Sequence, residues 1–157
     1  MKNKLITMAM LAALFSAMVF TQSCEKEGEG NETNISRHGD DDSHNMGQNC
    51  MNCHKNGGQG EGWFNVAGTV YNAAFTSGQP NGTVKLYTGP DGTGTLKYTV
   101  EVDSKGNFYT TEDIDFSGGL YPSVTGTSGD VQYMGTTITT GACNSCHNVS
   151  TSKIYVN

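Results

Sequence analysis

The chain has little positive charge. It carries nine Lys and Arg residues against fifteen Asp and Glu residues, so its formal net charge is −6 over 157 residues. Contacts with nucleic-acid phosphates need clusters of Lys or Arg, so we expect no nucleic-acid partner. The acidic balance favours a protein partner whose surface is neutral or basic.

Helix-forming residues are sparse beyond the N-terminal apolar stretch, whereas glycine is abundant, with 21 residues, and Thr, Ser and Asn are frequent. This composition favours short strands joined by many turns over a helical fold. The length is that of one domain, so we expect a single modest core.

The sequence also lacks an apolar run long enough for a membrane span, which needs about 20 residues. Its one apolar stretch, residues 5–20, follows the basic Lys2 and Lys4 and ends at a polar break over residues 21–23. This order is typical of an export signal. A transmembrane anchor is the alternative, but no charged stop-transfer segment follows. We therefore predict a signal peptide over residues 1–23.

Cys24 follows Ser23 and precedes the acidic segment 25–27. This junction resembles the lipobox end of a Bacteroidota-type lipoprotein, although residues 21–22 depart from the Leu-Ala/Ser preference of that pattern. The resemblance implies that Cys24 becomes the lipidated N-terminus and anchors an outer-membrane lipoprotein at the cell surface. The alternative is a periplasmic or secreted protein, which would carry an unpaired exported thiol.

Residues 24–43 are polar and acidic, contain few apolar residues and show no periodicity. These properties predict a flexible acidic tether. The Asp run at residues 40–42 lacks the spaced oxygen ligands and the turn glycine of a calcium loop such as the EF-hand. It therefore indicates a solvated charge run.

Residues 63–139 contain the short alternating stretches typical of β-strands, most clearly at residues 95–102. Residues 103–107 predict a hairpin turn. Pro122 weakens the strand around it or places that strand at a sheet edge. The predicted strands cover residues 64–71, 83–87, 95–102, 108–111, 120–126 and 131–138, with a last strand at 153–156.

The order of these motifs resembles the carboxypeptidase regulatory-like, or transthyretin-like, β-sandwich over residues 64–127. The most recognisable part is Asp-Ser-Lys-Gly-Asn-Phe at residues 103–108. The resemblance implies a structural scaffold without catalytic residues. We therefore expect a mainly β fold, with a single antiparallel β-sandwich flanked by two irregular or short-helical segments.

The pattern Cys-x-x-Cys-His occurs on both sides of this sandwich, and it is the signature of covalent c-type haem attachment. Each cysteine adds through sulfur to a vinyl group of the porphyrin, and the adjoining histidine supplies the proximal iron ligand. The pattern predicts two haem c groups in a dihaem domain over residues 44–157. The attachment residues and proximal ligands are Cys50, Cys53 and His54 in one copy and Cys143, Cys146 and His147 in the other.

The four motif cysteines and Cys24 account for all five in the chain, so none remains for a disulfide. The whole arrangement resembles the small exported dihaem modules of bacterial multihaem cytochromes, which implies electron transfer to other redox proteins or multihaem cytochromes. Trp63 and Phe64 directly follow the first motif and are candidates to pack on its haem. Whether the two motifs are neighbours or lie at opposite poles of the sandwich stays open.

Two histidines remain once the proximal ligands are assigned, His38 and His44. Two haems and two spare histidines suggest bis-histidine ligation at both irons, which gives lower potentials than His/Met ligation. The alternative ligands are Met46, Met51 and Met134. A histidine on the tether is also placed to reach the haem of a neighbouring subunit, which would build an open head-to-tail polymer.

Three other functions compete with the electron carrier. A dihaem peroxidase or reductase would need an open iron position and a distal acid or base. A zinc site made by the four motif cysteines would staple the ends of the sandwich but leaves the two following histidines unexplained. A surface binding module would use the sandwich itself, for which the sequence carries no binding signature.

Overall fold

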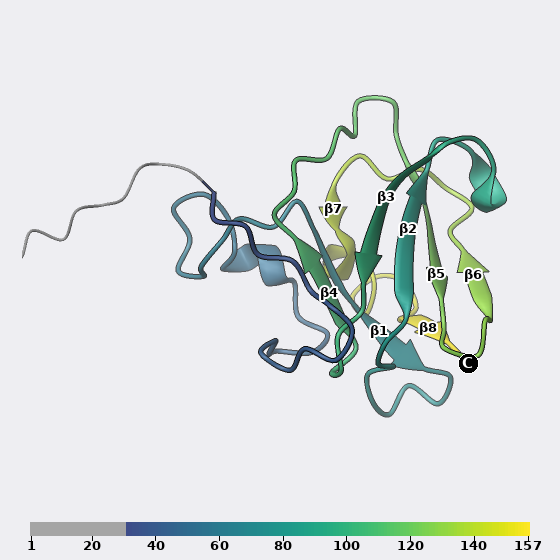
Figure 1. Cartoon of the computed structure of the whole chain (residues 1–157), viewed down its shortest axis with the longest axis horizontal. Helices are drawn as coiled ribbons and strands as arrows, with labels where there is room; N and C mark the ends of the chain where they lie inside the picture. The colour runs from purple at the N-terminus through teal and green to yellow at the C-terminus, as the bar shows by residue number, and fades with distance from the viewer. Residues whose placement is uncertain (1–30) are drawn as a thin grey trace, which may run out of the picture. The chain divides into compact units, whose positions relative to one another are not determined.

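The computed structural model describes residues 31–157, which form one unit of two packed β-sheets (Figure 1). The predicted mainly β sandwich is confirmed. No helix in this part of the chain is long and apolar enough to cross a membrane. The predicted signal peptide over residues 1–23 and the predicted lipidation site Cys24 lie outside the described residues.

The first sheet has the strand order β4-β1-β7, with β8 also paired to β1, and the second has the order β3-β2-β5-β6. All pairs of the second sheet are antiparallel, whereas β7 and β8 run parallel to β1. The strands are β1 (Val66–Asn72), β2 (Thr83–Tyr87), β3 (Leu96–Glu101), β4 (Asn107–Thr110), β5 (Tyr121–Thr125), β6 (Val131–Tyr133), β7 (Gly141–Ala142) and β8 (Ile154–Val156). Single turns of 3-10 helix form η1 (Cys50–Asn52), η2 (Pro90–Gly92) and η3 (Cys143–Ser145).

Alternating side chains turn one apolar face of each sheet toward the other. In β2, Val84 and Leu86 are buried, and Lys85 between them is only half-buried. Leu96 at the outer end of β3 stays 45% exposed, so only the inner part of that strand's apolar face enters the core. The core consists of Val66, Val70, Val84, Leu86, Val100, Val102, Phe108, Ile114, Leu120, Val124 and Val156.

Strand β1 is buried along almost its whole length. Val66 and Val70 belong to the core, while the alternate residues Thr69 and Tyr71 are covered from the other side. Asn144 of η3 covers Thr69, because its Oδ1 accepts a hydrogen bond from Thr69 N at 3.2 Å. The outer face of β1 is therefore the surface on which the Cys-x-x-Cys-His segments lie.

The turn at residues 103–107 is tight, but the predicted hairpin is wrong. Asp103 Oδ1 accepts hydrogen bonds from the amides of Lys105 and Asn107 at 2.8 and 2.9 Å. The turn carries the chain from β3 in the second sheet to β4 in the first, where β4 pairs with β1. The turn chemistry is local, whereas the partner of β4 follows from burying Phe108 in the core.

Pro122 does not mark an edge strand. Strand β5 lies between β2 and β6, and Pro122 pairs with Leu86. The Pro122 carbonyl accepts from Met134 N at 2.9 Å, so the proline nitrogen also faces β6, just where that strand ends. Since residue pairs in an antiparallel ladder bond alternately to each side, no bond to β2 is lost.

The prediction of a flexible tether is wrong for residues 31–43, which pack against the sandwich beside β4 (Figure 1). Ile35 forms a bridge with Thr110. Ser36 is fully buried, and its Oγ donates to the Glu101 carbonyl at 2.6 Å. These bonds cover the open edge of β4, which would otherwise present unpaired backbone groups. Residues 24–30 lie outside the described part of the chain.

Candidate functional site

The first Cys-x-x-Cys-His motif forms a single turn. Asn49 caps η1, since its Oδ1 accepts from Met51 N at 3.2 Å. The Cys50 carbonyl accepts hydrogen bonds from the amides of Cys53 and His54 at 3.1 and 2.9 Å. These bonds bring the two cysteines and the histidine together within one turn, as the chemistry of the motif requires.

The second motif repeats this turn in η3. The Cys143 carbonyl accepts from the amides of Cys146 and His147 at 3.2 and 3.0 Å. The backbone at Cys146 has φ −112° and ψ −51°, against φ −106° and ψ −42° at Cys53. In both copies the first cysteine is half-buried and the second is exposed. The two segments therefore present their sulfur atoms in the same way.

Both motif histidines are oriented by a backbone carbonyl. His54 Nδ1 lies 2.8 Å from the Glu61 carbonyl oxygen, and His147 Nδ1 lies 2.6 Å from the Ser152 carbonyl oxygen. A carbonyl only accepts, so each Nδ1 carries a proton and each Nε2 is the nitrogen left for another partner. Metal-ligating histidines typically have this arrangement, with the second nitrogen held by a carbonyl or carboxylate.

Aromatic side chains hold the ring of His54. Phe64 stacks on it with centroids 4.1 Å apart and planes 9° apart, and Tyr109 stacks on Phe64 at 4.8 Å. A Cβ at Gly60 would lie 2.6 Å from His54 Nδ1, so the backbone passes this ring where no other residue fits. Trp63 is held differently: its backbone N donates to Asn31 Oδ1, and its carbonyl accepts from Asn31 Nδ2.

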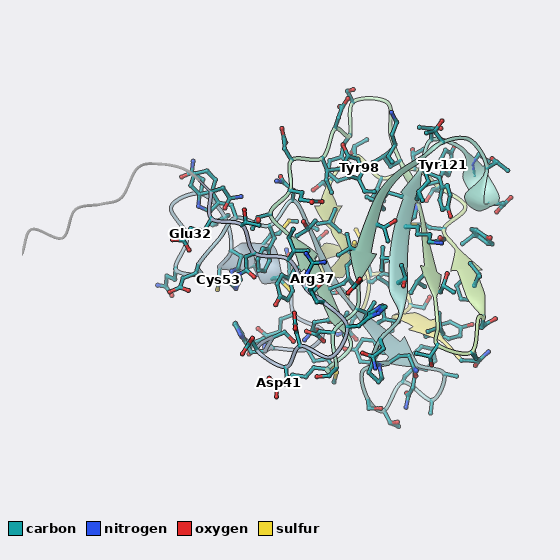
Figure 2. All side chains as sticks on the ribbon, viewed as in Figure 1. Glu32, Arg37, Asp41, Cys53, Tyr98 and Tyr121 are labelled. Atoms are coloured by element: carbon teal, nitrogen blue, oxygen red, sulfur yellow. The ribbon has the colours of Figure 1, made fainter. Side chains whose placement is uncertain are left out.

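A cleft of about 700 Å³ opens beside the first motif. This volume lies within the range of about 300–1,000 Å³ that cofactor sites occupy. Asp40, Asp42 and Glu61 line it, and no Lys or Arg of the described residues does. Figure 2 shows Cys53 and Tyr121 at opposite sides of the domain, so the cleft lies away from β5. Its walls include His44, Cys50, Cys53, His54, Phe64 and Tyr109.

The structure brings His44 to the first motif. The ring centroids of His44 and His54 lie 5.9 Å apart, and both side chains line the cleft. With metal–nitrogen bonds of about 2 Å, two imidazoles on opposite sides of one ion have centroids about 6 Å apart. The separation of the two rings is therefore that of two imidazoles that bind one ion.

The structure does not bring His38 to either motif. Its Nε2 lies 2.8 Å from the Gly82 carbonyl, next to β2, and its main-chain N donates to Glu101 Oε2 at 2.8 Å. Of the alternative methionines, Met46 is 44% exposed, and Met134 is bonded to β5 in the other sheet. Met51 lies inside η1.

The two motifs lie next to each other on the outer face of β1. Asn144, inside the second motif, donates from Nδ2 to the Gln48 carbonyl at 2.9 Å, just before the first motif. Burial raises the pKa of the Cys143 thiol to about 12, and the nearby Cys50 adds to the rise. The ends of the domain therefore meet, which the sequence left open.

All four motif cysteines are free thiols. A zinc staple would need their sulfur atoms around one ion, but in the described part of the chain no three His, Cys, Asp or Glu side chains form a metal-holding group. Sequence reasoning missed Thr69, Asn107 and Asn144, which connect the two motifs. Polar residues in strands and turns show no sequence pattern that predicts a shared hydrogen-bond network.

No family model, no curated protein and no solved structure matches this chain. The case for a function therefore depends on the residues of the site.

Proposed function

We propose that this chain is an exported electron carrier with two covalently attached haem c groups. The observation that carries the proposal is the repeated motif geometry, in which His54 Nδ1 and His147 Nδ1 each donate to a backbone carbonyl at 2.8 and 2.6 Å. This leaves each Nε2 as a ligand for iron. The haem supplies one-electron chemistry, and the protein sets ligation, burial and spacing.

The residues of the motifs have distinct roles in this proposal. Cys50 and Cys53 hold one haem through thioether bonds, and Cys143 and Cys146 hold the other. His54 and His147 are the proximal ligands. In each motif one half-buried and one exposed cysteine would form the two thioether bonds.

His44 would hold the iron of the first haem together with His54, because the two rings line the same cleft with centroids 5.9 Å apart. Bis-histidine ligation gives this haem a lower potential than ligation by His and Met. The acidic cleft wall and the net charge of the chain favour basic or neutral redox partners, such as other cytochromes. Lipidation at Cys24 would tether the carrier to the outer membrane.

A head-to-tail polymer has less support than the single carrier. His44 lies beside His54 of its own chain, which favours ligation within the chain. His38 would reach a neighbouring haem only after its bond to the Gly82 carbonyl breaks.

The direct test is production of the full chain in a host with cytochrome c maturation. We expect a red protein whose pyridine haemochrome spectrum gives two haems per chain. The double variants Cys50→Ala/Cys53→Ala and Cys143→Ala/Cys146→Ala should each retain one haem. Cys24→Ser is the matched control, since it should retain both haems and lose only the lipid. A colourless, zinc-containing product would overturn the proposal.

One observation favours the dihaem peroxidase or reductase as second candidate. Of the remaining histidines, His44 faces His54 and His38 is bonded to Gly82, so neither lies at His147. Carbon monoxide binding to the reduced protein separates the two functions. Uptake of one molecule per chain would support a redox enzyme with an open position at the second iron, and no uptake would support a six-coordinate carrier.

A further inference from the structure

A buried hydroxyl stands between the two motifs. Thr69 lies on the outer face of β1 and is 1% exposed. Its Oγ1 donates to Asn107 Oδ1 at 2.7 Å and accepts from Gly47 N at 2.9 Å and Asn144 Nδ2 at 3.1 Å. A hydroxyl has one donor and two acceptor positions, so every hydrogen-bonding position of Thr69 is used.

Two of these partners belong to the attachment segments. Gly47 lies three residues before Cys50, so its bond holds the entry to the first motif. Asn144 lies between the cysteines of the second motif and also donates to the Gln48 carbonyl at 2.9 Å. The same asparagine therefore contacts β1 and the first motif at once.

The third partner extends the network toward His44. Asn107 Nδ2 donates to Ser43 Oγ at 2.9 Å, and Ser43 directly precedes His44. Lys105 Nζ donates to the Ser43 carbonyl at 2.8 Å. Asn107 and Ser43 are buried, as are Thr69 and Asn144. The segment that carries His44 is thus connected to Thr69 through Asn107.

We propose that Thr69 is the positioning residue that sets the separation of the two haem attachment turns, and thereby the electronic coupling between the haems. The inference rests on the proposed function. A fully satisfied network in a low-dielectric interior is rigid, because each lost bond leaves a buried polar group without a partner. The two segments also meet directly, since Asn144 Nδ2 donates to the Gln48 carbonyl and Asn148 Nδ2 donates to the Gly47 carbonyl, at 2.9 and 3.4 Å. Thr69 adds the buried bonds that fix both segments to β1.

With both haems bound, this placement would allow one electron to pass between them, so that one iron is oxidised as the other is reduced and no bond is made or broken. Thr69 does not contact a reacting atom. It acts by holding Gly47 and Asn144, and through them both motifs, at a constant separation.

The test compares Thr69→Val, which removes the hydroxyl but keeps the branched shape, with Thr69→Ser, which keeps the hydroxyl. Thr110→Val is the matched control, since Thr110 is equally buried in the same sheet but its Oγ1 accepts only from Glu112 N, at 3.0 Å. Two measurements are made. Hydrogen exchange of the Gly47 amide reports whether its bond to Thr69 is present, with or without haem. Soret circular dichroism reports the electronic coupling between the two haems.

We expect a bisignate Soret signal in the wild type, its loss in Thr69→Val and its retention in Thr69→Ser and Thr110→Val. Loss of the bond should also make exchange of the Gly47 amide roughly tenfold faster in Thr69→Val alone. A Thr69→Val protein that keeps both the bisignate signal and the protected amide would overturn the inference. An equal change in Thr110→Val would do so too, since it would show general loosening.

Asn144→Ser tests the same hydrogen-bond network if Thr69→Val does not accumulate, because it removes the bonds to Thr69 and Gln48 together. This variant should lose the bisignate signal, and retention of the signal would count against the role of the network. Haem content distinguishes a failure of the proposed function from a failure of the inference about Thr69. A wild type without haem would refute the proposed function, and the Gly47 amide would still show whether Thr69 holds the first motif.

Discussion

Replacement of His44 by Ala is the sharpest test of the first haem site. His44 is the side chain that faces His54, with ring centroids 5.9 Å apart, so its loss removes one axial ligand from one iron of the two. We expect half of the haem to change from low-spin to high-spin and one carbon monoxide site per chain to appear at that iron. In the haem-free chain His44 is exposed, so there the free energy of unfolding should change by no more than about 0.5 kcal/mol.

Electron paramagnetic resonance of the ferric protein and carbon monoxide titration of the ferrous protein measure both effects. His44→Met is a second variant, which should keep six-coordination and raise the potential of one haem, since Met ligation raises haem potentials. His38→Ala is the matched control, because His38 is bonded to Gly82 away from the cleft. The reasoning fails if His44→Ala keeps the low-spin spectrum of the wild type, or if His38→Ala changes the spectrum as much.

Two further predictions do not depend on haem. Gly68→Ala should destabilise the sandwich by about 1–3 kcal/mol in thermal unfolding, because its Cβ would lie 2.6 Å from Phe108 Cζ and 3.0 Å from Cys143 Cβ; an unchanged melting temperature would contradict this packing. Burial raises the pKa of Cys143 from 9.0 to about 12. The unfolded haem-free chain therefore loses this proton first, and stability should fall as pH rises from 9 to 12. At pH 9 iodoacetamide should modify the exposed Cys53 and Cys146 before Cys143, and equal rates would refute the burial.

Much of the strand pattern was predictable because it depends on neighbours in the chain. The alternation at residues 95–102 matches β3, and residues 83–87 match β2 at both ends. Pairing was not predictable in the same way. The turn at residues 103–107 has hairpin chemistry, yet it joins the two sheets because burial of Phe108 decides the partner of β4.

The packing of residues 31–43 escaped sequence reasoning for a related reason. Ile35 pairs with β4 through backbone groups, which every residue carries, and Ser36 adds bonds from one short polar side chain to β3 and β4. A polar composition therefore does not distinguish a free segment from one that covers a sheet edge. The same difficulty hides Thr69, whose role depends on three partners distant in the sequence.

The sequence alone determined the mainly β class and the two Cys-x-x-Cys-His turns, since each motif closes through bonds within five residues of chain. Tertiary structure alone decided that the motifs are neighbours, that His44 and not His38 faces His54, and that Thr69 joins both segments. The physical reason is the distance along the sequence between the interacting residues. A turn is selected by its own residues, whereas a shared buried hydrogen bond exists only after the core has brought distant segments together.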